Sequence, residues 1–404
     1  MIRKLLFMLF ALAAILATLA GCSGPQVRSL SPEDNPEHHY VAGMNALENG
    51  RVATAEEKFE RAVLLDERFS KGYAGLAIVT AEKTKTQPDA KFKAIEVEKA
   101  FAYLGKAKKY ADKPEEEFDY FTAKVRVHTL LKDEEWLNRA EQSFKSGGEL
   151  KLDERALSYY QGGEALTYYM GLAYLDGLEF QKARDRFADV LGARREGKWH
   201  EKADRAWKKT DRIVRAMAGI TVGYVGKKIA AQDVVTRADL AALLVDELKL
   251  DKLFAGRIPV ASQLAKMQAD FTPADMVNHP FKDEVLTMMK WKVRGMEPKF
   301  DAATNAPLFK PADSVTRGEM AFILEDVLIK LTGDDKLATA YFGQDKSPFP
   351  DVRSTSPFYN AVINMTTRGI MEGELSGEFR LTEAVDGADA LLAIRVLNQK
   401  KNIY

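Results

Sequence analysis

Apolar residues recur with a helical period along the first half of the chain, from about His38 to Arg215, and turn residues interrupt them at intervals. Apolar positions three and four residues apart share one face of a helix, so the pattern predicts amphipathic helices rather than strands. The interruptions are typical of short connections between antiparallel helices. We therefore expect a stack of helical hairpins over residues 38–203 and a mainly α fold.

The clearest unit reads HHYVAGMNALENGRVATAEEKFERAVLLDERF, and its small and aromatic residues follow a fixed spacing. They stand at offsets of 0, 3, 7, 12, 16 and 19, as Gly43, Ala46, Gly50, Ala55, Phe59 and Ala62. Small residues let two helices approach closely, while an aromatic ring fills the space between neighbouring hairpins. The unit resembles a tetratricopeptide repeat. That resemblance implies an α-solenoid whose concave surface binds a peptide or a protein partner.

The second half of this spacing recurs three times, as Ala100, Leu104, Ala107, as Ala140, Phe144, Gly147, and as Ala183, Phe187, Val190. The last copy is the cleanest, because Gly171 precedes Ala183 by the twelve residues that separate Gly43 from Ala55. The two middle copies need insertions. We therefore expect two well-formed repeats and two degenerate ones.

A charged segment leads out of the helical half, from Ala193 to Arg215. It holds nine Lys or Arg against four acids, with Trp199 and Trp207 interleaved. A charge run of this kind is either a solvated helix face or one wall of a binding site for an anionic polymer.

The second half of the chain repeats a helix start, VVTRADLAALL at residues 234–244 and SVTRGEMAFIL at residues 314–324. Thr-x-x-acid is a capping box, which explains Thr236 with Asp239 and Thr316 with Glu319. It does not explain the Arg between them, since a cation at the first helical position opposes the helix dipole.

The stretch FPDVRSTSPFYNAVINMTTRGIMEGELSGEFRLTEAVDGADALLAIRVL, from Phe349 to Leu397, resembles a surface-layer homology repeat, which begins with an FxD motif. A preceding unit carries Phe281-Lys282-Asp283 as its FxD motif, and an earlier unit is less complete. We place the three repeats at about 204–255, 271–333 and 347–404. The resemblance implies a mostly helical, pseudo-threefold domain with a central helix bundle and grooves between its lobes.

The same resemblance implies roles for three side chains. Arg237 and Arg317 would line the grooves and meet acidic groups of a cell-wall polysaccharide, such as ketal-pyruvate, because a guanidinium binds a carboxylate bidentately. A structural salt bridge between lobes is the other role open to them. Trp291 would either stack on a sugar ring or pack in the core.

The third repeat departs from the pattern. Aligned without gaps, Asp386, Gly387 and Asp389 take the places of the Thr, Arg and Glu of the second repeat. The cap is kept and the Arg is lost. Because the first repeat also lacks an obvious FxD motif, at most two grooves keep the expected cation.

The N-terminus reads as a targeting segment. Arg3 and Lys4 precede an uncharged apolar run, Leu5–Thr18, that is too short to span a bilayer. The following Leu19-Ala20-Gly21-Cys22 resembles a bacterial lipobox, and Cys22 is the only cysteine. The resemblance implies a signal peptide at residues 1–21, acylation of Cys22 and a membrane anchor, with Ser23 pointing to the outer membrane. Residues 22–37 then form a flexible tether.

Composition and motifs narrow the function classes. Lys plus Arg and Asp plus Glu are both 59, so no charge excess favours nucleic acid as the partner. The sequence holds no HExxH, GxSxG or P-loop, and its five His residues form no metal-ligand spacing. We expect no catalytic residue, no metal and no cofactor.

The sequence thus predicts a non-catalytic lipoprotein of the outer membrane, facing the periplasm. Its C-terminal repeats would bind cell-wall polysaccharide or peptidoglycan, and its solenoid an unidentified protein. Two other functions stay open. One is an assembly or secretion adaptor whose C-terminal domain contacts protein instead of wall. The other is a glycan-processing enzyme, which would need a carboxylate pair facing a deep cleft.

Overall fold

The computed structural model describes residues 29, 31–193, 196–257 and 266–400. The predicted signal peptide and the predicted lipidation site Cys22 lie outside the described residues. Within them the chain is mainly helical, with one two-stranded hairpin, so the predicted fold class is confirmed at this level. No helix in these ranges combines the length and the apolarity that crossing a bilayer requires.

The chain forms two compact units. Unit 1 comprises Met1–Ala173 and Gly192–His200, and unit 2 comprises Tyr174–Leu191 and Glu201–Tyr404. The last helical hairpin of the predicted solenoid is therefore divided, with Gly171 in unit 1 and Phe187 in unit 2.

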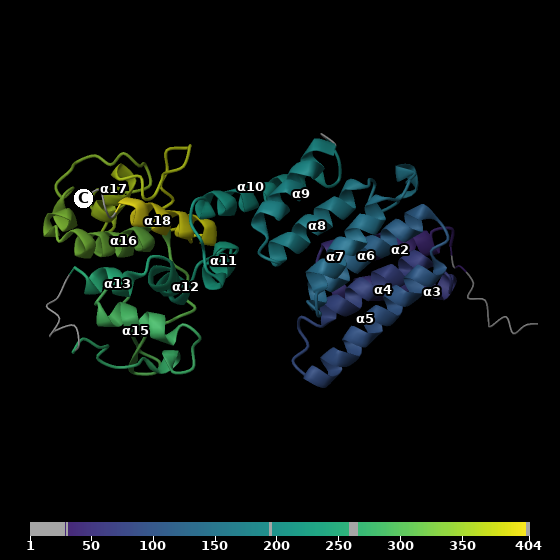
Figure 1. Ribbon diagram of the computed structural model, residues 1–404, viewed down its shortest axis with the longest axis horizontal. Helices are drawn as coiled ribbons and strands as arrows, with labels where there is room; N and C mark the ends of the chain where they lie inside the picture. The colour runs from purple at the N-terminus through teal and green to yellow at the C-terminus, as the bar shows by residue number, and fades with distance from the viewer. Residues whose placement is uncertain (1–28, 30, 194–195, 258–265, 401–404) are drawn as a thin grey trace, which may run out of the picture. The chain divides into compact units, whose positions relative to one another are not determined.

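Unit 1 is built from helical hairpins (Figure 1). Its helices are α2 (Pro36–Glu48), α3 (Val52–Leu65), α4 (Ser70–Lys83), α5 (Ala90–Tyr110), α6 (Pro114–Leu131), α7 (Trp136–Gly148), the short 3-10 helix η1 (Glu154–Ala156), and most of α8 (Glu164–Asp176). Helices α2 and α3, α4 and α5, and α6 and α7 pack as consecutive pairs. The first helix of each pair also contacts the first helix of the next, α2 with α4 and α4 with α6. This is the packing expected of stacked hairpins.

Phe59 shows how the small residues permit this stacking. Its side chain is fully buried, and it lies against both Gly43 of α2 and Gly75 of α4. A Cβ atom would stand 2.6 Å from Phe59 Cε1 at Gly43 and 2.4 Å from it at Gly75, so neither position tolerates a side chain. The spacing read from the sequence corresponds to this contact. The assignment to the tetratricopeptide family stays a prediction.

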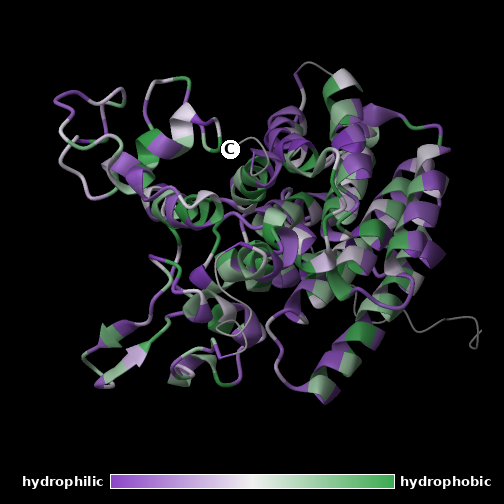
Figure 2. Cartoon of the chain, turned by 60° about the vertical axis from the view of Figure 1, so that its left-hand side comes forward, coloured by the Kyte–Doolittle hydropathy of each residue, from purple (hydrophilic) through white to green (hydrophobic). Residues whose placement is uncertain are grey.

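Unit 2 is built around short helices that begin at the repeated motifs. Its elements are most of α9 (Phe180–Ala193), α10 (His200–Met217), α11 (Tyr224–Ala230), α12 (Arg237–Ala242), the π-helical turn η2 (Leu243–Glu247), α13 (Leu250–Ala255), the 3-10 helix η3 (Ala274–Met276), α15 (Lys282–Lys290), β1 (Lys299–Asp301), β2 (Ala306–Leu308), α16 (Arg317–Thr332), the 3-10 helix η4 (Asp335–Thr339), α17 (Tyr359–Thr367) and α18 (Gly387–Lys400). Figure 2 shows the hairpin of β1 and β2 extending away from the helices of this unit.

Both predicted capping boxes are present. Asp239 N donates to Thr236 Oγ1 at 3.2 Å, and Thr236 N donates to Asp239 Oδ2 at 3.0 Å. The pair Thr316 and Glu319 repeats both bonds at 3.2 and 3.0 Å. Each box fixes the start of a helix, α12 or α16.

The residues before these helix starts are joined in a closed ring of backbone hydrogen bonds. Val315 N donates to Val235 O at 2.9 Å, Val385 N to Val315 O at 2.9 Å, and Val235 N to Val385 O at 2.8 Å. All three side chains are buried. Each repeat thus donates one bond and accepts one, which satisfies backbone groups that burial would otherwise leave unpaired.

Candidate functional site

Arg237 is held by the backbone of the following repeat. It is 4% exposed, and its Nε, Nη1 and Nη2 donate to Phe309 O at 3.0 Å, Gly295 O at 2.8 Å and Glu297 O at 3.0 Å. Its guanidinium carbon lies 4.7 Å from the centre of the Phe309 ring. Burial lowers the pKa of Arg237. The side chain therefore joins two segments of the chain through carbonyl groups, and the ligand contact suggested by the sequence stays a prediction.

Arg317 repeats this clamp one repeat further on. Its Nε donates to Phe379 O at 2.7 Å and its Nη2 to Glu372 O at 2.6 Å, and its guanidinium carbon lies 4.9 Å from the centre of the Phe379 ring. The third nitrogen differs, because Nη1 faces a carboxylate, Asp389 Oδ2, at 3.4 Å. The third donor of this guanidinium thus meets an anionic side chain, where that of Arg237 meets a carbonyl oxygen.

Trp291 packs in the core. It is 3% exposed, its ring meets Phe254 edge-on at 5.4 Å, and its Nε1 donates to Asp251 Oδ1 at 2.7 Å. Of the two roles open to Trp291, this geometry supports the structural one.

In the third repeat Gly387 stands where the other two repeats have Arg. The backbone at the end of α11 occupies the space that an Arg side chain would need. Gly387 N donates to Gln232 O at 3.0 Å, and a Cβ at Gly387 would lie 1.7 Å from Ile229 O at the end of α11. No side chain fits there. The loss of the Arg seen in the sequence therefore goes with direct contact between α18 and α11.

A cavity of about 450 Å³ lies beside Arg317, and we call it the Arg317 groove. The segment from Gly369 to Leu375 and helix α18 form much of its lining, and Arg212 of α10 contributes from outside the three capping motifs. Three cations and three acids line it: Arg212, Arg317, Arg395, Glu372, Glu374 and Asp389. Ile370, Met371, Leu392 and Val396 add an apolar part. The groove thus presents charged groups of both signs beside an apolar surface.

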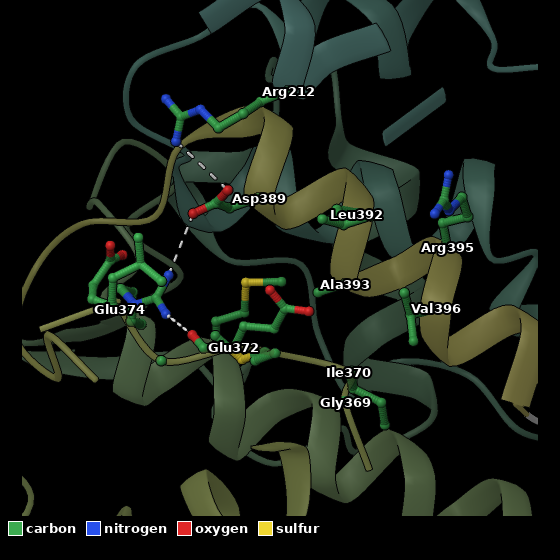
Figure 3. Close-up of a pocket in the computed structure, with 15 residues that line it drawn as sticks. Arg212, Gly369, Ile370, Glu372, Glu374, Asp389, Leu392, Ala393, Arg395 and Val396 are labelled. Carbon is green, nitrogen blue, oxygen red and sulfur yellow. Dashed lines mark hydrogen bonds and ion pairs between the residues drawn. The ribbon is translucent and has the colours of Figure 1, made fainter. Parts of the chain in front are cut away.

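Asp389 and Arg212 lie next to each other in the lining of the groove (Figure 3). Arg212 Nη1 lies 2.8 Å from Asp386 Oδ2 and 3.7 Å from Asp389 Oδ1. Burial, followed by the nearby charge of Asp386, raises the pKa of Asp389 above its usual range, although Arg212 and Arg317 act in the opposite direction.

The cations of helix α10 fall into two groups. Arg205, Lys208 and Arg215 are exposed and pair along the helix with Glu201, Asp204 and Asp211, as on a solvated face. Arg212 instead lines the groove. Its role could not be read from the sequence, because nothing local distinguishes it from the neighbouring cations.

In each of the last two repeats, an aspartate side chain accepts hydrogen bonds from two backbone N–H groups further along the chain. Asp351, in the FxD motif, accepts from Phe379 N at 2.8 Å and from Leu381 N at 3.1 Å. In the second repeat Asp275 does the same for Phe309 N and Lys310 N, at 3.0 and 2.7 Å. The equivalent of the FxD aspartate is therefore Asp275 and not Asp283, the residue we chose from the sequence.

Changing Asp351 to Asn should destabilise unit 2 in a pH-dependent way. Burial opposes ionisation of Asp351, but the hydrogen bonds from Phe379 N and Leu381 N outweigh it, and the pKa is lowered. The stabilisation is thus fully present above the pKa of an unfolded Asp, about 3.9, and is lost as the pH falls through the lower folded value. We expect a loss of about 1 kcal/mol at pH 7 that disappears in acid. Thermal unfolding from pH 7 to about pH 2 measures it, and a pH-independent difference would contradict the assignment.

Comparison with known proteins supplies one match. Residues 348–391 match the family model of the S-layer homology domain. No curated protein and no solved structure matches the chain. The matched segment contains the part of the Arg317 groove from Gly369 to Leu375, and also Asp389. The C-terminal part of the chain is therefore similar, over these residues, to the S-layer homology domain.

Proposed function

We propose that this protein binds an acidic cell-wall polysaccharide in the Arg317 groove and has no catalytic activity. The observation that carries the proposal is the overlap between the groove and the S-layer homology match, because residues 369–375 and Asp389 belong to both. The nearly buried guanidinium of Arg317 lines the groove beside them. The ring of backbone bonds through Val235, Val315 and Val385 supports a pseudo-threefold arrangement of the three repeats.

The chemistry of the groove fits such a ligand. A carboxylate of the polysaccharide would bind between Arg317 and Arg212, whose planar donors suit a bidentate contact. The sugar ring would cover Ile370, Met371 and Leu392, the apolar part of the lining. For Arg237 we propose no ligand contact, because its three nitrogens already donate to carbonyl oxygens. We propose none for Trp291 either, because it is buried.

For the whole chain we propose a tether. Acylation at Cys22 would hold it on the outer membrane, facing the periplasm, and the predicted tether would let the folded units stand away from the membrane. The stacked hairpins of unit 1 support binding of a protein partner, because such stacks present an extended surface.

Replacing Arg317 by Gln tests the groove. We expect the unlipidated mature protein to sediment with purified sacculi that retain their attached polymers. The variant should bind at least about tenfold more weakly, because it loses the charge that meets the ligand. Sacculi stripped of these polymers should retain neither protein.

Arg237 offers a matched control, since it makes the same kind of clamp between the first and second repeats. Arg237→Gln should disturb folding as much as Arg317→Gln does, which thermal unfolding of both variants checks. A folded Arg237→Gln protein should bind as the wild type does. Equal loss of binding in the two variants would contradict a site at Arg317, and failure of the wild type to sediment would contradict wall binding altogether.

A further inference from the structure

The Arg317 groove already contains an anion that belongs to the protein. Asp389 places Oδ2 3.4 Å from Arg317 Nη1 and Oδ1 3.7 Å from Arg212 Nη1. Figure 3 shows this carboxylate beside the guanidinium of Arg212. A ligand carboxylate that enters the groove would seek the same two guanidinium groups.

The first two repeats use the equivalent acid differently. In them Asp239 and Glu319 turn back to close the capping box and accept from the N–H of the capping threonine. In the third repeat Asp386 accepts from Asp389 N at 2.9 Å, and the carboxylate of Asp389 reaches the two arginines. Helix α18 thus keeps the capping hydrogen bond from Asp389 N to the Asp386 side chain, while the carboxylate of Asp389 lies in the groove.

The surrounding charges leave Asp389 as the acid that bridges both arginines. Asp386 meets Arg212 at 2.8 Å. Glu374 is paired with Arg380 at 2.5 Å, and Arg380 also meets Glu383. Arg212 is 44% exposed, so it can turn toward a ligand without leaving a buried site, whereas Arg317 is fixed by two carbonyl groups.

We propose that Asp389 is an internal counter-ion that a carboxylate of the wall polymer must displace from between Arg212 and Arg317. This proposal rests on the function proposed above and describes its regulation. Because the two carboxylates compete for the same donors and repel each other, Asp389 weakens binding and makes it selective for ligands of sufficient charge.

The competition depends on pH in a defined direction. Burial and the charge of Asp386 raise the pKa of Asp389, so Asp389 becomes neutral at a higher pH than an ordinary aspartate does. Once neutral, it no longer competes with the ligand. Binding by the wild type should therefore tighten as the pH falls toward the acid range.

Changing Asp389 to Asn tests the proposal, since Asn keeps the shape and removes the charge. With sacculi that retain their polymers, we expect this variant to bind about tenfold more tightly than the wild type at pH 7. The two affinities should converge as the pH falls. The pH series on the wild type tests the same competition if the variant does not fold.

A second pair of variants tests whether Arg212 contacts the ligand. Arg212→Ala should weaken binding, whereas Arg205→Ala, on the same helix and 71% exposed, should not. If the wild type binds but Asp389→Asn binds equally or more weakly, Asp389 positions Arg317 and the competition is contradicted while wall binding stands. If no variant binds at any pH, the proposed function itself fails.

Discussion

Alanine in place of Gly387 is expected to destabilise unit 2 by about 3 kcal/mol or more, the upper part of the range for overpacked sites. The added methyl group would stand 1.7 Å from Ile229 O and 2.9 Å from Ala230 Cα. These are backbone atoms, which no rotation of a side chain can move away. Helix α18 would have to separate from α11 and break the bond from Gly387 N to Gln232 O.

Thermal unfolding of the full mature chain measures this effect, with Gly256→Ala as the matched control in the same unit. At Gly256 a Cβ would meet its nearest neighbour, Lys252 O, at an ordinary distance of 3.6 Å, so the control should unfold close to the wild type. Restoring the motif with Gly387→Arg should destabilise at least as much as alanine does. A wild-type melting temperature for either Gly387 variant would show that α18 and α11 do not meet as described.

Truncation of Phe59 to Ala is expected to cost unit 1 about 3–5 kcal/mol, as for a large aromatic residue removed from a packed core. Phe59 is fully buried, and Gly43 and Gly75 leave room for its ring only because they lack side chains. The variant would leave a cavity where α2, α3 and α4 meet.

Denaturant unfolding, monitored through hydrogen exchange of peptides from α2, α3 and α4, measures this loss of stability. Phe92→Ala is the control, because Phe92 is 60% exposed and its removal should change stability by less than about 0.5 kcal/mol. A loss below about 1 kcal/mol for Phe59→Ala would contradict the stacking of these helices around its ring.

Local features of the fold were predictable from the sequence. The helical period gave the hairpins of unit 1, and Thr-x-x-acid gave two helix starts, because a cap involves residues only three positions apart. The alignment of Gly387 with Arg317 also corresponds to the structure, where both residues begin a helix and contact the next repeat.

Features that depend on contacts between distant segments were not predictable. The sequence shows that a capping box does not require Arg237. It does not show that the donors of Arg237 meet the carbonyl groups of Gly295, Glu297 and Phe309. The second repeat has Pro273 where an FxD motif ending at Asp275 would need Phe, whereas Phe281-Lys282-Asp283 fits the motif. Arg212 reaches the groove only because α10 lies near α18 in the folded unit.

Hydrogen–deuterium exchange of the mature protein, with and without solubilised wall polymer, shows where the polymer binds. We expect slower exchange in residues 369–375 and in the first turns of α16 and α18, which surround the Arg317 groove. The segment around Arg237 should be unchanged. Protection confined to unit 1, or protection that persists in Arg317→Gln, would contradict the proposal that this groove binds the cell wall.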